Sequence, residues 1–213
     1  YRLELAYAWS NVGSVQEARG DLVAAEESFA RTLDVKSSLV EADPGNVDWL
    51  GELAEEHNKL AVVQEKLGRY REALQSHREE VRLKGRLLEM DPAQSYWRFR
   101  LAVGMGFAGD LERVAGSGEE AVRLHREQMA ILDSLTAFDP ANAMWRRDAA
   151  IARRDLATIL TGLGQPGAAL ALLDEAAPLL GALLAADSAG YVSRWDVASV
   201  HRSRAIALAA MGD

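Results

Sequence analysis

The chain has 213 residues, of which 49% are hydrophobic and 26% are charged, a balance that excludes a disordered protein. Its net charge of -8 disfavours binding to nucleic acids or anionic membranes, because phosphate contacts need a concentrated surface of lysine and arginine. With no cysteine, the fold needs neither disulfides nor an oxidising compartment, and we expect a cytoplasmic protein. The apolar run over residues 176–186 is shorter than the roughly 20 residues that span a bilayer, so we interpret it as a buried helix face.

Several residue types recur at a fixed interval of 48 residues, in phase with one another. Composition alone does not produce such columns, so they predict four repeats and one half repeat. We place the repeats at about residues 1–45, 46–93, 94–141, 142–189 and 190–213, all within one domain. The columns are Gly20, Gly68, Gly116, Gly164 and Gly212; Ala25, Ala73, Ala121 and Ala169; Asp43, Asp91, Asp139 and Asp187; and Leu39, Leu87, Leu135 and Leu183.

Each repeat is predicted to form two helices, as residues 46–93 illustrate. Apolar residues there recur at three- and four-residue spacings, which is typical of amphipathic helices. Asn46 is placed to cap the first helix, and Gly68 to end it, because glycine accepts the left-handed conformation that a helix C-terminus commonly needs. The short interval from Gly68 to Ala73 leaves room only for a tight turn, so the two helices are expected to be antiparallel neighbours.

Nine helices are expected along the chain. About six turn residues in each period leave two helices of roughly 20 residues, the first beginning at or near Tyr1 and the last covering about residues 189–211. One such pair cannot bury its apolar stripe alone, so the pairs must stack. The predicted fold class is all-α, a right-handed α-solenoid of antiparallel helix pairs. Because Tyr1 stands where an initiator methionine would be, we expect a fragment of a longer chain.

These columns resemble those of tetratricopeptide repeats (TPRs), in a long-helix variant with a 48-residue period. The resemblance rests on a small residue where paired helices touch, and on an alanine column followed four residues later by a larger residue. The period is 48 and not 34, and the helix-ending proline of the family is absent. The chain is similar to the variety found in bacterial multidomain proteins. The small residues are Gly13, Ala61, Gly109, Ala157 and Ala205, and the larger ones are Phe29, His77, His125 and Leu173.

The resemblance implies a non-catalytic protein–protein interaction scaffold that binds a peptide or partner domain in its concave groove. The groove would be lined by the first helix of each pair. Two arginines among these positions suggest a partner with an acidic group or a C-terminal carboxylate, because arginine can grip a carboxylate with two parallel hydrogen bonds. The residues carried over are Ser10, Asn11, Asn58, Lys59, Phe107, Asp110, Arg154, Asp155 and Arg202.

Two other functions are compatible with the same architecture. The chain could be the regulatory arm of a larger effector, such as a signalling ATPase, kinase or protease. It could also be a homotypic assembly module, because the uncapped ends of a solenoid leave apolar surface uncovered.

No catalytic, cofactor or metal site is predicted. Residues 104–109 match the dinucleotide-binding pattern G-x-G-x-x-G, but they lie in the middle of the helix expected over residues 95–115, where such a site needs a preceding strand. The histidines at 57, 77, 125 and 201 follow repeat columns and are interpreted as semi-buried packing residues. Trp49, Trp97 and Trp145 are expected to anchor each first helix on the preceding unit. Adjacent glutamates at 55–56, 79–80 and 119–120 are interpreted as solvated faces, so we expect no enzyme.

Overall fold

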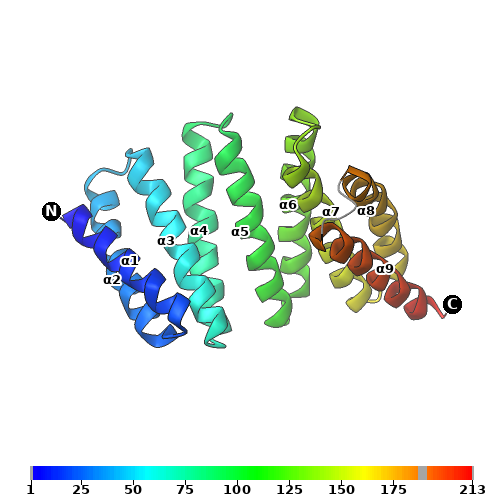
Figure 1. Cartoon of the computed structure of the whole chain (residues 1–213), viewed down its shortest axis with the longest axis horizontal. Helices are drawn as coiled ribbons and strands as arrows, with labels where there is room; N and C mark the ends of the chain where they lie inside the picture. Colours follow the sequence, from blue (N-terminus) through cyan, green and yellow to red (C-terminus); the bar gives the residue numbers. More distant parts are fainter. Residues whose placement is uncertain (1, 187–190, 213) are drawn as a thin grey trace. The chain divides into compact units, whose positions relative to one another are not determined.

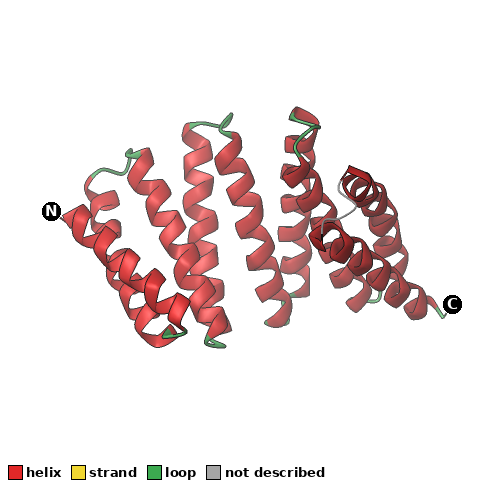
Figure 2. Ribbon diagram, in the orientation of Figure 1, coloured by secondary structure: helices red, strands yellow, loops and turns green. Residues whose placement is uncertain are grey.

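The computed structural model describes residues 2–186 and 191–212, and these form nine helices (Figures 1 and 2). Short turns join the first eight helices. The predicted number of helices is confirmed, and so is the end of the last helix at Met211. The predicted starts at Tyr1 and near residue 189 fall outside the described residues. The helices are α1 (Arg2–Arg19), α2 (Leu22–Ala42), α3 (Val47–Lys66), α4 (Tyr70–Met90), α5 (Ser95–Val114), α6 (Gly118–Phe138), α7 (Ala143–Gly162), α8 (Pro166–Ala186) and α9 (Tyr191–Met211).

The helix ends follow the sequence signals. All five glycines of the 48-residue column have a positive φ, between 74° and 88°, the left-handed conformation that a side chain disfavours. Asn46 caps α3 by accepting a hydrogen bond from the backbone N–H of Trp49 at 3.1 Å, and Asn142 caps α7 by accepting one from Trp145 at 3.1 Å. Local chemistry therefore sets the repeat boundaries.

The chain divides into two compact units, Tyr1–Leu111 (unit 1) and Glu112–Asp213 (unit 2). In unit 1, α1 packs on α2 and α3 on α4, and α2 also packs on α3. Gly13 lets the two helices of the first pair approach, because a Cβ there would lie 2.7 Å from the Phe29 ring. The core of unit 1 includes Ala25, Phe29, Leu33, Leu50, Leu53, Leu60, Leu83 and Leu87.

In unit 2, α7 packs on α6, α8 and α9, and α8 packs on α9. Among the described residues, only α8 is long and apolar enough to cross a membrane by length and composition, so the run over residues 176–186 belongs to a longer apolar helix than the sequence analysis considered. One face of α8 is nevertheless in the protein core, as expected. Its buried residues are Ala169, Leu173, Ala176, Leu180 and Leu183.

Candidate functional site

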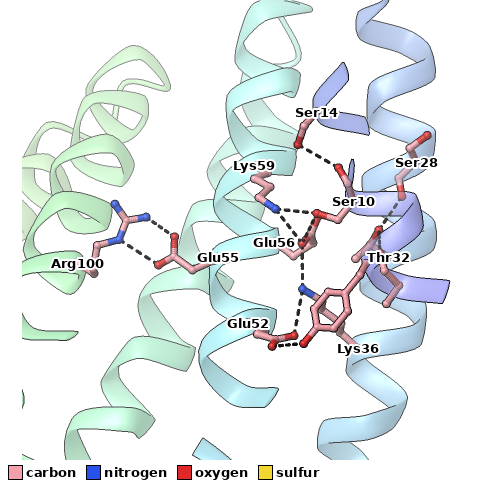
Figure 3. Close-up of polar contacts among 12 residues, drawn as sticks. Ser10, Ser14, Ser28, Thr32, Lys36, Glu52, Glu55, Glu56, Lys59 and Arg100 are labelled. Carbon is pink, nitrogen blue, oxygen red and sulfur yellow. Dashed lines mark hydrogen bonds and ion pairs between the residues drawn. The ribbon is translucent and has the colours of Figure 1, made fainter. Parts of the chain in front are cut away.

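The first helices of unit 1 carry a buried polar network (Figure 3). The side chain of Glu56 on α3 is fully buried. Its Oε2 accepts hydrogen bonds from the Ser10 hydroxyl at 3.1 Å and the Lys36 ammonium at 3.2 Å, and it lies 3.4 Å from Nζ of Lys59. One buried carboxylate is thus held from α1, α2 and α3, and the lysines balance the charge that burial would otherwise penalise.

Glu52 lies one turn before Glu56 on α3, beside the same network. Its Oε1 accepts a hydrogen bond from the Tyr7 hydroxyl at 2.5 Å, and its Oε2 lies 3.5 Å from Nζ of Lys36. The hydrogen bond to Glu52, followed by burial, raises the pKa of Tyr7 to about 12, because a phenolate would meet the charge of the carboxylate. Tyr7 therefore remains a neutral hydrogen-bond donor.

A second charge cluster joins α3, α4 and α5. Lys84 on α4 is fully buried, pairs with Glu80 one turn before it, and lies 3.3 Å from Glu55 on α3. Arg100 on α5 donates two hydrogen bonds to the same Glu55 (Figure 3). Burial alone would lower the pKa of Arg100, but the contact with Glu55 outweighs it and the pKa is raised. Arg100 therefore stays charged.

His77 extends the second cluster. Its Nδ1 lies 2.8 Å from Glu80 and its Nε2 lies 2.9 Å from Glu65, and its ring stacks on Phe107 of α5 at 5.3 Å. Burial alone would lower the pKa of His77, but the two carboxylates outweigh it and raise the pKa. Burial alone would raise the pKa of Glu80, but His77 and Lys84 outweigh it and lower the pKa. The imidazole and the carboxylate therefore favour the charged pair.

The sequence analysis missed these buried charges, and its interpretation of the adjacent glutamates as solvated faces is wrong for Glu56 and Glu80, which are both 0% exposed. A signal was present in the repeat. A lysine in a column that elsewhere holds core leucines has to be buried, and a buried lysine needs an acidic partner. That column is Lys36, Lys84, Leu132 and Leu180.

A hollow of about 620 Å³ opens on the first helices of unit 1. Its wall includes the Glu52–Glu56 network and the aromatic residues Tyr96 and Trp97 at the start of α5. Trp97 packs so closely on α3 that a Cβ at Gly51 would lie 2.6 Å from its ring. The predicted anchoring of a first helix by this tryptophan is therefore confirmed.

A second hollow, of about 430 Å³, lies in unit 2 between α7 and α9. Arg154 donates hydrogen bonds to Asp155 at 2.6 Å and to Ser199 at 3.0 Å, and its guanidinium lies 5.8 Å from the ring of Trp195. Arg202 also lines this hollow and is exposed. Within residues 2–186 and 191–212, Arg202 forms no ion pair or hydrogen bond.

The nine residues predicted to contact a partner are divided between the two units. Ser10, Asn11 and Lys59 line the hollow of unit 1, although Ser10 is buried by its bonds to Glu56 and Lys59. Arg154 and Arg202 line the hollow of unit 2. The other four lie outside the two hollows: Asn58 donates to Glu80 at 3.2 Å, Phe107 stacks on His77, Asp155 pairs with Arg154, and Asp110 is exposed.

Polar pairs connect successive first helices at sequence separations of 45 or 49 residues, one period minus three or plus one. This spacing places each pair on facing turns of neighbouring helices. Several residues predicted to contact a partner, such as Ser10, Lys59 and Arg154, are therefore also structural links between first helices. The pairs are Tyr7–Glu52, Glu55–Arg100 and Arg154–Ser199 at 45 residues, and Ser10–Lys59, Glu17–Lys66 and Arg147–Asp196 at 49.

The glycine-rich pattern over residues 104–109 lies inside α5, and no strand occurs in the described part of the chain. The structure explains the first glycine of the pattern by packing, since a Cβ at Gly104 would lie 3.1 Å from the buried Glu80 carboxylate. His77 and His125 are 0% and 1% exposed and pack in the cores, as predicted, whereas His201 is exposed and the packing interpretation is wrong for it.

Residues 2–186 and 191–212 contain no group of three or more histidine, aspartate or glutamate side chains arranged to hold a metal ion. The hollows are lined by aromatic rings, hydroxyl groups and charged side chains. Such walls bind organic groups through stacking and hydrogen bonds.

Residues 57–90 match the family model of the tetratricopeptide repeat. The match covers the second half of α3 and the whole of α4. The chain has a TPR-like repeat fold. The matched stretch has the usual length of a TPR, so the additional residues of the 48-residue period extend the TPR-like helices.

Solved structures show the same TPR-like fold. BtubC (BKLC) from P. vanneervenii is similar with a TM-score of 0.67 and 19% identity, over 84% of this chain and 64% of BtubC. A protein from Podosopora anserina, described as a kinesin light chain with nearly identical TPR-like repeats, is similar with a TM-score of 0.65 and 15% identity, over 100% of this chain and 92% of that one. The chain thus spans less than two thirds of BtubC. No curated protein matches the sequence.

Proposed function

We propose that this chain is a protein-interaction module and that the face formed by its first helices binds a peptide or a partner domain. The observation that supports this most directly is the position of the two hollows, both of which are lined mainly by first helices, α1, α3 and α5 in unit 1 and α7 and α9 in unit 2. TPR-like repeats generally serve protein–protein interaction, and clefts lined by aromatic and charged side chains are typical binding sites.

The hollow of unit 2 is suited to a carboxylate on such a partner. Arg202 is exposed with its guanidinium unpaired within the described residues, while Trp195 and Ile206 beside it are 56% and 52% exposed. A C-terminal or side-chain carboxylate would pair with Arg202, and the neighbouring apolar part of a peptide would cover the two exposed side chains. Arg154 is engaged by Asp155 and would add a weaker attraction.

The test is a selection of random peptides with free C-termini on the immobilised chain, followed by calorimetric titration of the enriched peptides. The peptides should bind as free acids. Their affinity should fall at least about tenfold when they are amidated, or when the Arg202→Glu variant is used in place of the unsubstituted chain, as the loss of a charged hydrogen bond implies. Arg126→Glu, which changes an exposed arginine on α6, is the matched control. A chain that selects no peptide refutes the interaction module, and peptides indifferent to amidation refute the carboxylate site.

Self-association is a second candidate, because α1 exposes an apolar stripe. Leu5, Val12 and Val15 are 44%, 42% and 52% exposed, whereas the residues one period later in α3 are buried core residues. Light scattering over a concentration series should show a rising mass that Val15→Glu abolishes and that Val23→Glu, an exposed valine of α2, leaves unchanged. A constant monomer mass excludes this candidate. The buried equivalents are Leu53, Leu60 and Val63.

A further inference from the structure

One end of the hollow in unit 1 combines two carboxylates with aromatic rings. Asp48 and Glu52 lie one turn apart on α3 and both line it. Tyr7 of α1 and Tyr96 of α5 are 40% and 54% exposed there, and Tyr96 makes an edge contact with Trp97 at 4.8 Å. Acidic groups beside exposed aromatic rings form a binding site for a cation that has a flat or apolar body.

The acids of this hollow differ in how far the protein neutralises them. Glu55 is held by Arg100 and Lys84. Asp48, by contrast, has no ion pair or hydrogen bond within residues 2–186 and 191–212, and it is exposed. The negative charge that remains available to a ligand is therefore at the Asp48 end of the hollow.

Two oxygen atoms in the hollow also lack a hydrogen bond, although Oε2 of Glu52 lies 3.5 Å from Nζ of Lys36. Oε1 of the fully buried Glu56 and Oε2 of Glu52 are both buried without a hydrogen-bond partner among the described residues. Glu56 is fully buried, whereas the Glu52 side chain is 31% exposed, so a donor that enters the hollow would meet Glu52, which it would share with Lys36. Oε2 of Glu52 is the nearer of the two to Asp48, since it lies only one turn away along α3.

The two lysines of the hollow leave Asp48 without a cation, because Lys36 is shared between Glu52 and Glu56. Lys36 is buried between Glu52 and Glu56, and Lys59 hydrogen-bonds Ser10. Lys59 lies eleven residues after Asp48 on the same helix, which is about 16 Å at 1.5 Å per residue. Over that distance the repulsion of a bound cation by Lys59 is largely screened at physiological salt.

Arginine fits this end better than other cations. Its guanidinium has five donors in a planar fork, which can bridge two carboxylates while its face stacks on an aromatic ring. A metal ion has no flat apolar body to cover the exposed rings of Tyr96 and Tyr7, and an anion would be repelled by Asp48. We propose that the Asp48–Glu52 end of the unit 1 hollow binds an arginine side chain of a partner peptide. This inference rests on the proposed interaction function and specifies the chemistry of one contact.

The probe is the peptide acetyl-Gly-Gly-Arg-Gly-Gly-amide, whose only charge is the guanidinium. Titration of the ¹⁵N-labelled chain should give saturable shifts of the indole N–H signals of Trp49 and Trp97, which line this hollow, and none for Trp195 in unit 2. The same peptide with citrulline, which keeps the shape and loses the charge, should bind at least about tenfold more weakly. Absence of shifts at millimolar peptide, or equal binding of the two peptides, overturns the proposal.

Paired variants localise the contact. Asp48→Asn with Glu52→Gln should weaken binding of the arginine peptide at least about tenfold. Glu41→Gln with Glu89→Gln removes the same charge from exposed positions of α2 and α4 and should leave the affinity unchanged. Equal affinities in the two double variants refute the site. If the arginine peptide fails while the chain still binds peptides from the random selection, only this inference falls; a chain that selects no peptide refutes the interaction function itself.

Discussion

Replacing glycine by alanine at a turn and inside a helix should change the free energy of unfolding in opposite directions. Gly68 has a φ of +74°, whereas Gly85 lies in the interior of α4, and a Cβ added at either position would meet no atom within 4 Å. Neither alanine variant can therefore clash with a neighbouring side chain. Any difference between them reports the backbone conformation alone.

The expected magnitudes follow from that conformation. Gly68→Ala should lower the free energy of unfolding by about 1–2 kcal/mol, because an L-residue pays this much in the left-handed region. Gly85→Ala should raise it by about 0.5–1 kcal/mol, because alanine loses less conformational freedom than glycine on entering a helix. Gly68→Asn should cost less than Gly68→Ala, since asparagine tolerates the left-handed region.

Urea unfolding followed by circular dichroism measures all three variants, with the urea dependence of the free energy unchanged if only stability differs. A neutral or stabilising Gly68→Ala would show that the 48-residue glycine column does not reflect a conformational need. A destabilising Gly85→Ala would show that the space beside α4 is filled, contrary to the structure.

Two further predictions concern unit 1. The pKa of His77 is raised from its ordinary 6.5, so its contribution to the free energy of unfolding is fully present below pH 6.5 and is lost as the pH rises through the folded-state pKa. Urea unfolding measured across pH should show this fall in stability, and His77→Gln should remove it. A fall that persists in His77→Gln, or that vanishes in the exposed control His201→Gln, contradicts the assignment. Gly51→Ala should destabilise the chain by about 1–3 kcal/mol, because its Cβ would lie 2.6 Å from Trp97. This cost should largely disappear when Trp97→Leu is already present. Additive effects in that double-mutant cycle would show that the two residues do not compete for space.

The helices and turns could be predicted because their determinants are local. The glycine column, the asparagine caps and the apolar spacing each act within a few residues, and the 48-residue period repeats the same evidence along the chain. The structure accordingly agrees with the sequence at the glycine turns and at the caps of α3 and α7. The resemblance to TPRs likewise identified the fold, since its columns are contacts within and between neighbouring helices.

The residues of the candidate sites were predicted less completely than the helices and turns. The column argument selected Ser10, Lys59, Arg154 and Arg202, which do line the hollows. It did not find Glu52 or Asp48, because these positions become neighbours of Tyr7 and Tyr96 only when three first helices stand side by side. Adjacent glutamates look alike in sequence, yet Glu56 faces the core and Glu55 faces Arg100.

The sequence by itself therefore determined the repeat, its helices and its turns, since backbone conformation at a cap or a glycine depends on the nearest residues. Only the tertiary structure decided which charges pair with one another and that Asp48 has no ion pair among the described residues. The free energy of a charged side chain depends on the solvent and counter-charges around it, and for Lys84, Glu56 and Glu52 those are supplied by helices that lie far apart in the chain.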